Sequence, residues 1–167
     1  MLALIVGALL AIDPSHSTAM FSVQHIFVEK VEGKVPIARG SIELPEGTLV
    51  PTHVSAVLDG TKLKTDDEDR DGALRSDDWF DTKNFPTWTF ESTQITATAT
   101  GFTMVGMLTI HGVAKEETLS VIASGTQANP VYHATCKIDR HAFGMKTTRL
   151  DAAIGGMVDI TLDIRAL

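Results

Sequence analysis

Short runs in which apolar and polar residues alternate recur along the chain, and this period of two constrains the fold more than any other feature. In the clearest run, residues 158–165, every apolar residue falls on one face and every polar residue on the other. Side chains of a β-strand point alternately to opposite faces, so this run predicts a strand with one buried and one wet face. Similar runs predict strands at 21–25, 41–44, 54–58, 88–92, 102–110, 118–123 and 132–138.

These runs, about eight in all, predict an all-β antiparallel domain. A sheet with one apolar face covers that face either by packing against a second sheet or by closing into a barrel, and an eight-stranded barrel leaves space for one small ligand. The alternation alone does not separate these two architectures. A chain of 167 residues is long enough for one domain with its own core and short for two.

The segment 66–81 departs from the alternation, because charged residues surround a few apolar ones there. It predicts a short helical insertion between strands. Its aspartates have nearly the spacing of a calcium loop, but the preceding residues 54–58 are predicted as a strand rather than an entering helix, and the last aspartate is shorter than the usual closing glutamate. We predict no metal site and keep a weak calcium site as the alternative, with the ligands Asp67, Asp69, Asp71 and Asp78.

Residues 1–11 form an unbroken apolar run, which has the length of a signal-peptide core and is too short to span a membrane. The run predicts export to the periplasm or secretion, with a β-barrel domain over 12–167. No Lys or Arg precedes it, so a first strand or an apolar terminal segment is the alternative. The sequence leaves open whether residues 1–11 are cleaved.

Composition and motifs exclude several classes of function. The net charge of −7 argues against nucleic acid, which is bound through clustered cations. Cys136 is the single cysteine, and the six histidines show none of the spacings of zinc sites. No nucleophile elbow, P-loop or dinucleotide fingerprint occurs, so we expect a protein that is not an enzyme and has no cofactor.

Five stretches carry a resemblance that extends over nearly the whole chain from residue 12. They are IDPSHS at 12–17 leading into FSVQH at 21–25, RDGALRSDDWFD at 70–81, FPTWTFES at 85–92, GMLTIHGV at 106–113 and IDRHAFGM at 138–145. In this order they resemble the YceI-like family of polyisoprenoid-binding, lipocalin-like proteins. Ala73 stands where the family pattern has a histidine, so any polar role of that histidine is absent here.

The resemblance implies an extended antiparallel β-barrel whose pore takes up a long isoprenoid chain, such as a polyprenyl phosphate or a quinone. It also implies a periplasmic or secreted protein. From alternation alone, an ordinary packed core is the simpler interpretation of the inward residues, and the resemblance favours a ligand-binding lumen instead.

Mapped onto a closed sheet, one set of alternating side chains points inward and forms the predicted lumen. Gly40, Ala56 and Gly106 are small residues at inward positions, and we expect them to leave width for a ligand. His25 would give the lumen a titratable contact. The predicted lumen residues are Phe21, Val23, His25, Ile42, Leu44, Leu58, Trp88, Phe90, Phe102, Met104, Leu108, Ile110, Ile160 and Leu162.

Three arginines are candidates for binding an anionic head group: Arg75 in the insertion, and Arg140 and Arg149 around the last hairpin. The alternative is that Asp139 and Asp151 pair with the last two on a solvated face.

The predicted function is binding of a long-chain isoprenoid or similar amphiphilic lipid for carriage or storage. One alternative is a barrel enzyme acting on a bound lipid through His25 or the Asp139–Arg140 pair. The other is a secreted stress or interaction protein whose barrel is filled by its own side chains. Neither a membrane span nor a nucleic-acid partner is expected, and the sequence leaves open a homodimer and the identity of the ligand.

Overall fold

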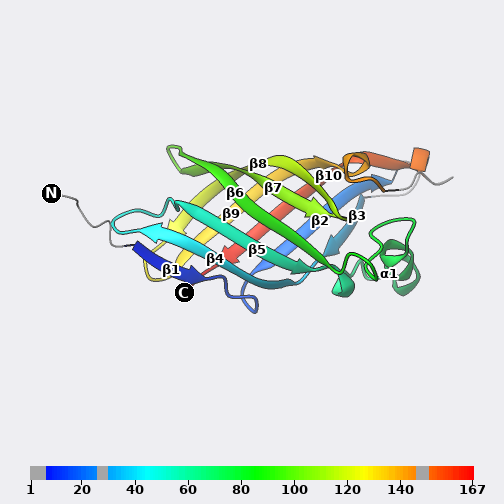
Figure 1. Cartoon of the computed structure of the whole chain (residues 1–167), viewed down its shortest axis with the longest axis horizontal. Coiled ribbons are helices and arrows are strands. Elements are labelled where there is room, and N and C mark those ends of the chain that lie inside the picture. The colour runs from blue at the N-terminus through cyan, green and yellow to red at the C-terminus, as the bar shows by residue number, and fades with distance from the viewer. Residues whose placement is uncertain (1–6, 26–29, 146–150) are drawn as a thin grey trace.

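The computed structural model describes residues 7–25, 30–145 and 151–167, and these form one antiparallel sheet that curls around a long axis (Figure 1). Within this part of the chain the sheet has ten strands, in the order β1-β4-β5-β6-β7-β8-β9-β10-β2-β3. The elements are β1 (Gly7–Ala11), β2 (Thr18–His25), β3 (Lys30–Lys34), β4 (Ile37–Pro45), β5 (His53–Asp59), η1 (Gly60–Lys62), α1 (Glu68–Arg75), β6 (Thr87–Ala97), β7 (Gly101–Ile110), β8 (Val113–Gly125), β9 (Pro130–Asp139), η2 (Arg140–Phe143), η3 (Asp151–Ala153) and β10 (Ile154–Arg165).

The extended segment 30–45 closes the sheet into a barrel, because its two halves pair with strands that are far apart in the strand order. The first half, β3, pairs with β2, and the second half, β4, pairs with β5. Only Val35 and Pro36 separate the halves, and proline has no N–H to donate to a ladder. At the junction the Val35 N–H donates to the Ala19 carbonyl at 3.0 Å, and the Asp59 N–H donates to the Pro36 carbonyl at 2.8 Å.

The end of the barrel that holds both β1 and the C-terminus is joined by a second set of backbone hydrogen bonds (Figure 1). Ala11 and Leu167 exchange N–H to carbonyl bonds of 3.0 Å in both directions. The Ile12 N–H donates to the Gly40 carbonyl, also at 3.0 Å. β1 therefore lies between β4 and the end of β10.

The predicted all-β antiparallel barrel is confirmed, and each of the predicted strands corresponds to an observed one, from β2 and β4 to β10. When β3 and β4 are counted as one bent strand, the barrel matches the eight-stranded prediction apart from β1. The alternation missed β3, which carries one large apolar side chain, Val31, among charged residues.

The alternation also missed β1, whose residues are all apolar or glycine and therefore do not alternate. This strand lies inside the run that predicts a signal peptide, and it pairs with β4 from Gly7–Pro45 to Ala11–Ser41. Export and cleavage of residues 1–11 stay predictions. No helix within the described ranges is long and apolar enough to cross a membrane.

Helix α1 lies within the predicted insertion 66–81, at the end of the barrel remote from β1 (Figure 1). Asp67 caps it, and its carboxylate accepts a hydrogen bond of 3.0 Å from the Arg70 N–H. Asp71 is buried, and one of its carboxylate oxygens accepts bonds from the Thr65 N–H at 2.7 Å and the Thr65 hydroxyl at 2.6 Å. Both carboxylates are thus used to fix the start of the helix.

Residues 68–75 are helical, whereas the ligands of a calcium loop have to converge on one point. The predicted calcium-loop spacing therefore belongs to the start of a helix and not to a chelating loop; its residues are Asp67, Asp69, Asp71 and Asp78. Across the parts of the chain that the structure describes, no group of three or more Asp, Glu, His or Cys residues is placed to hold a metal ion.

We predict that Asp71→Ala lowers the free energy of unfolding by about 1–3 kcal/mol, because it leaves the buried Thr65 N–H and hydroxyl without an acceptor. Asp69→Ala is the matched control, since Asp69 lies in the same turn with an exposed side chain. We expect the control to cost about 0.5 kcal/mol or less. Urea unfolding followed by circular dichroism measures both, and equal losses would contradict this role of Asp71.

Candidate functional site

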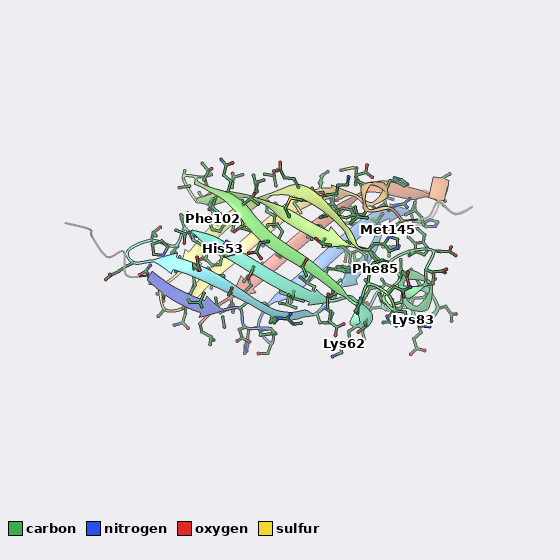
Figure 2. All side chains as sticks on the ribbon, viewed as in Figure 1. His53, Lys62, Lys83, Phe85, Phe102 and Met145 are labelled. Carbon is green, nitrogen blue, oxygen red and sulfur yellow. The ribbon has the colours of Figure 1, made fainter. Side chains whose placement is uncertain are left out.

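The barrel encloses a cavity of about 470 Å³ that follows its long axis. Phe102 and Met145 both line it, and they lie toward opposite ends of the barrel (Figure 2). Side chains of β2 to β10 form the wall, and almost all of them are apolar. A volume of this size is typical of small-molecule sites, which span roughly 300–1,000 Å³.

The alternation correctly predicted most of the cavity wall, because inward positions of every strand recur with period two. All of the predicted lumen residues except Leu44 line the cavity. These are Phe21, Val23, His25, Ile42, Leu58, Trp88, Phe90, Phe102, Met104, Leu108, Ile110, Ile160 and Leu162.

Leu44 has the inward parity of β4 and is only 2% exposed, but it lies outside the cavity wall. It belongs to the end of the barrel that is closed by the loop after β4. There the Tyr132 hydroxyl donates to the Leu49 carbonyl at 2.8 Å, and the Gln127 side-chain amide donates to the carbonyls of Pro45, at 2.8 Å, and Thr48. The prediction of Leu44 as a lumen residue was wrong because the lumen stops before this level.

The two predicted spacer glycines serve the packing of neighbouring side chains instead of a ligand. A Cβ atom at Gly106 would lie 2.3 Å from Cζ of Phe90, and one at Gly40 would lie 2.5 Å from Cδ1 of Ile12. Each glycine therefore makes room for a ring or an aliphatic side chain of the protein itself. Ala56, the third small residue, does line the cavity.

The helical insertion forms the wall at the other end of the cavity, a role that the strand pattern does not predict. Leu74, Trp79 and Phe80 line the cavity there. The Phe80 ring packs on Trp88 with a centroid distance of 4.6 Å. The few apolar residues among the charges of this segment indicate that it packs against the barrel, since a fully exposed insertion would not require large apolar side chains.

The predicted head-group arginines separate in the structure. Arg140 is 4% exposed and lines the cavity, and its Nε and Nη2 donate to the carbonyls of Gly155 at 2.9 Å and Ile154 at 3.0 Å. Its guanidinium also lies 5.2 Å from the centroid of the Trp79 ring. Arg75 points elsewhere, with its Nη2 bonded to the Leu63 carbonyl, and does not line the cavity.

Arg149 lies outside the described residues, as does the side chain of Asp151. Asp139 accepts a hydrogen bond of 3.0 Å from the His141 N–H. Arg70 lines the cavity in the place that was predicted for Arg75, with its Nε bonded to the Thr65 hydroxyl at 2.8 Å and its Nη2 to the Thr65 carbonyl at 2.6 Å. Two arginines therefore border the α1 end of the cavity.

Two further polar atoms at this end are buried and lack a hydrogen-bond partner within the described part of the chain: Nδ1 of His25 and Nε1 of Trp88. Both residues line the cavity, and Trp88 is only 7% exposed. Leaving a buried donor or acceptor unpaired costs about 1–3 kcal/mol. Polar atoms in such positions are suited to bind polar groups of a ligand.

Glu117 and Cys136 also line the cavity, and neither is among the predicted lumen residues. Their parity along β8 and β9 could have revealed them, because Glu117 lies on the same face of its strand as the buried Leu119, and Cys136 on the same face as the buried Ala134. Burial, together with a smaller effect of the nearby Glu117 carboxylate, raises the pKa of the Cys136 thiol to about 12. Cys136 is therefore a protonated thiol at neutral pH.

An antiparallel barrel around an elongated apolar cavity, with two arginines at one end, has the architecture of the lipocalin-like class of barrels. The chain belongs to the YceI-like family, because the sequence profile of the YceI-like domain matches residues 10–166. The UPF0312 protein SA2479 of Staphylococcus aureus (strain N315) is 32% identical over 119 residues, which cover 71% of this chain and 67% of the relative.

Solved structures show the same fold. BcnA of Burkholderia cenocepacia superposes with a TM-score of 0.84 at 21% identity, over 93% of this chain and 99% of that one. The YceI protein of Campylobacter jejuni gives a TM-score of 0.72 at 20% identity, over 85% and 87%. A polyisoprenoid binding domain from Saccharophagus degradans gives 0.70 at 14% identity, over 94% and 97%.

Cys136 is a natural reporter of the lumen because it is the single cysteine of the chain. The thiolate is the reactive form, so at pH 8 we expect iodoacetamide to alkylate the folded protein roughly a hundredfold or more slowly than the protein unfolded in urea. Mass spectrometry of timed samples measures both rates. Equal rates in the two states would contradict the placement of Cys136 in the cavity wall.

Proposed function

We propose that this protein binds a long-chain isoprenoid or similar amphiphilic lipid, of the polyprenyl phosphate or quinone class, in the barrel lumen. It carries or stores the lipid in the periplasm or outside the cell, without changing it chemically. The observation that carries this proposal is the apolar cavity of about 470 Å³ along the barrel axis. A barrel filled by its own side chains, which is the alternative, would not contain a cavity of this volume.

The energetics of hydrocarbon burial support tight binding without any catalytic group. Each buried CH₂ contributes about 0.8 kcal/mol, so roughly fifteen of them contribute about 12 kcal/mol before the costs of association. A thin, unbranched or methyl-branched chain fits an elongated lumen better than a compact ligand does. A relative with the same fold, from Saccharophagus degradans, is named a polyisoprenoid binding domain, which favours this lipid class.

The charges at the α1 end suggest how the lipid is oriented. Arg140 and Arg70 border the cavity there, whereas the β1 end is lined by apolar side chains such as Phe102 and Ile42. We propose that the hydrocarbon tail lies toward the β1 end and that an anionic head group contacts Arg140. Arginine suits this role because its planar guanidinium binds phosphate oxygens in pairs.

The lumen can be tested by filling it. Ala56 lines the cavity, so Ala56→Trp should displace the lipid, whereas Ala114→Trp adds the same ring at an exposed position of β8. In native mass spectrometry of protein purified without detergent, we expect a bound hydrophobic ligand in the wild type and Ala114→Trp but not in Ala56→Trp. Thermal melting checks that each variant is folded.

Lipid that stays bound to folded Ala56→Trp would contradict a luminal site, and wild-type protein that neither carries nor takes up lipid would contradict the function. Chemical conversion of the extracted lipid, lost in His25→Gln, would favour the enzyme alternative, for which His25 with its unpartnered Nδ1 is the candidate.

The head-group contact is tested by comparing a polyprenyl phosphate with the corresponding polyprenol. We predict that Arg140→Gln weakens binding of the phosphate about tenfold and leaves the alcohol nearly unchanged, because only the phosphate forms charge-assisted hydrogen bonds. Arg39→Gln removes the same charge from an exposed position of β4 and should change neither affinity. Equal weakening of both ligands by Arg140→Gln would indicate a structural role alone.

A further inference from the structure

Glu117 places a carboxyl group in the wall of an otherwise apolar lumen. It lies on β8 with the inward parity of Leu119 and Val121, both of which are buried and line the cavity. Its neighbours along the strand, Glu116 and Thr118, are exposed on the outer face. The side chain of Glu117 therefore faces the space that we propose for the lipid.

The surroundings of Glu117 leave its side chain room, with the Cys136 thiol nearby and no paired cation among the described residues. The residue opposite on β7 is Gly106, which has no side chain, and the Phe90 ring occupies the space beside that glycine. On the other side, the register of β8 with β9 starts only at Ser120–Thr135, so Glu117 lies beyond the paired part of the two strands. Among the described residues, no hydrogen bond or ion pair engages its carboxylate.

A carboxyl group in this position is costly unless a ligand satisfies it. Burial in the apolar wall raises the pKa of Glu117, and the negative charge of Asp139 raises it further. Both effects disfavour the ionised form of the carboxyl group. The pattern of the strand, in which Leu119 and Val121 face inward, would favour another aliphatic residue at position 117.

We propose that Glu117 selects the ligand by accepting a hydrogen bond from an N–H or O–H group, a protonated amine above all, that the amphiphile carries beside its hydrocarbon chain. The inference rests on the proposed lipid-binding function and narrows it. An ionised carboxylate is only an acceptor, and its bond to a cationic donor is stronger than one to a neutral hydroxyl. A head group with both an anion and a donor would satisfy Arg140 and Glu117 together.

The test compares three ligands with the same hydrocarbon chain: hexadecylamine, hexadecanol and hexadecanoate. Each is titrated below its aggregation limit against protein loaded with the fluorescent probe N-phenyl-1-naphthylamine, and displacement gives relative affinities. Glu117→Gln keeps the shape of the side chain and removes its charge. Glu116→Gln is the matched control, because it makes the same change on the neighbouring residue that faces outward.

We expect wild-type protein to bind the amine more tightly than the alcohol, and the carboxylate most weakly. Glu117→Gln should weaken the amine about tenfold, strengthen the carboxylate and leave the alcohol within about twofold, whereas Glu116→Gln should change none of them. If Glu117→Gln binds the amine as tightly as wild type does and still binds the alcohol, the proposed role of Glu117 is overturned, whereas the proposed lipid binding is not. Equal effects of the two variants would also overturn it, since net charge would then be the cause.

Failure of all three ligands to displace the probe from wild-type protein would instead overturn the proposed lipid binding, and the inference with it. Melting temperatures of the variants are compared with that of the wild type. We expect Glu117→Gln to be at least as stable as wild type without ligand, because it removes a desolvated charge.

Discussion

The exchange of pairing partners within the segment 30–45 turns the curled sheet into a closed barrel. β3 pairs with β2, and β4 pairs with β5. Because only Val35 and Pro36 separate β3 from β4, this segment connects the two ends of the strand order. Closure converts the apolar face of every strand into an inner wall. Without it, the same side chains would need a second sheet to cover them, and there would be no elongated cavity.

Within that wall, polar groups are distributed unevenly along the axis. Arg70, Arg140, His25 and Trp88 gather near the end covered by α1, and the β1 end is closed by the loop that Tyr132 and Gln127 hold. An amphiphile has the same asymmetry, with one polar end and one long apolar part. The asymmetry of the cavity supports the proposal of an amphiphilic ligand, and in that proposal Glu117 distinguishes one polar group from another.

The sequence predicted the parts of this structure that depend on local periodicity. Strand positions and inward residues such as Leu108 and Ile160 follow from a period of two, and Glu117 follows from the same rule, although a search for apolar residues overlooks it. Parity gives the face of a strand on which a residue lies, but not the level at which the lumen ends, and this is why Leu44 was misassigned. Parity also does not say which side chain fills the space beside a glycine, and this is why Gly40 and Gly106 were misassigned. Arg70, for which no role was predicted, lines the cavity and Arg75 does not, because the direction of a side chain on a short helix depends on tertiary contacts such as those to Thr65 and Leu63.

In the proposed function, hydrocarbon fills the space inside the barrel. The most direct measurement is an isotope-filtered nuclear Overhauser experiment on protein with labelled methyl groups and an unlabelled alkyl-chain ligand. We expect cross-peaks from the alkyl chain to the luminal methyl groups of Leu108, Leu119 and Ile160. Cross-peaks confined to the exposed side chains of Leu9, Ile122 and Leu167 would contradict it, because the lipid would then lie on the outer surface.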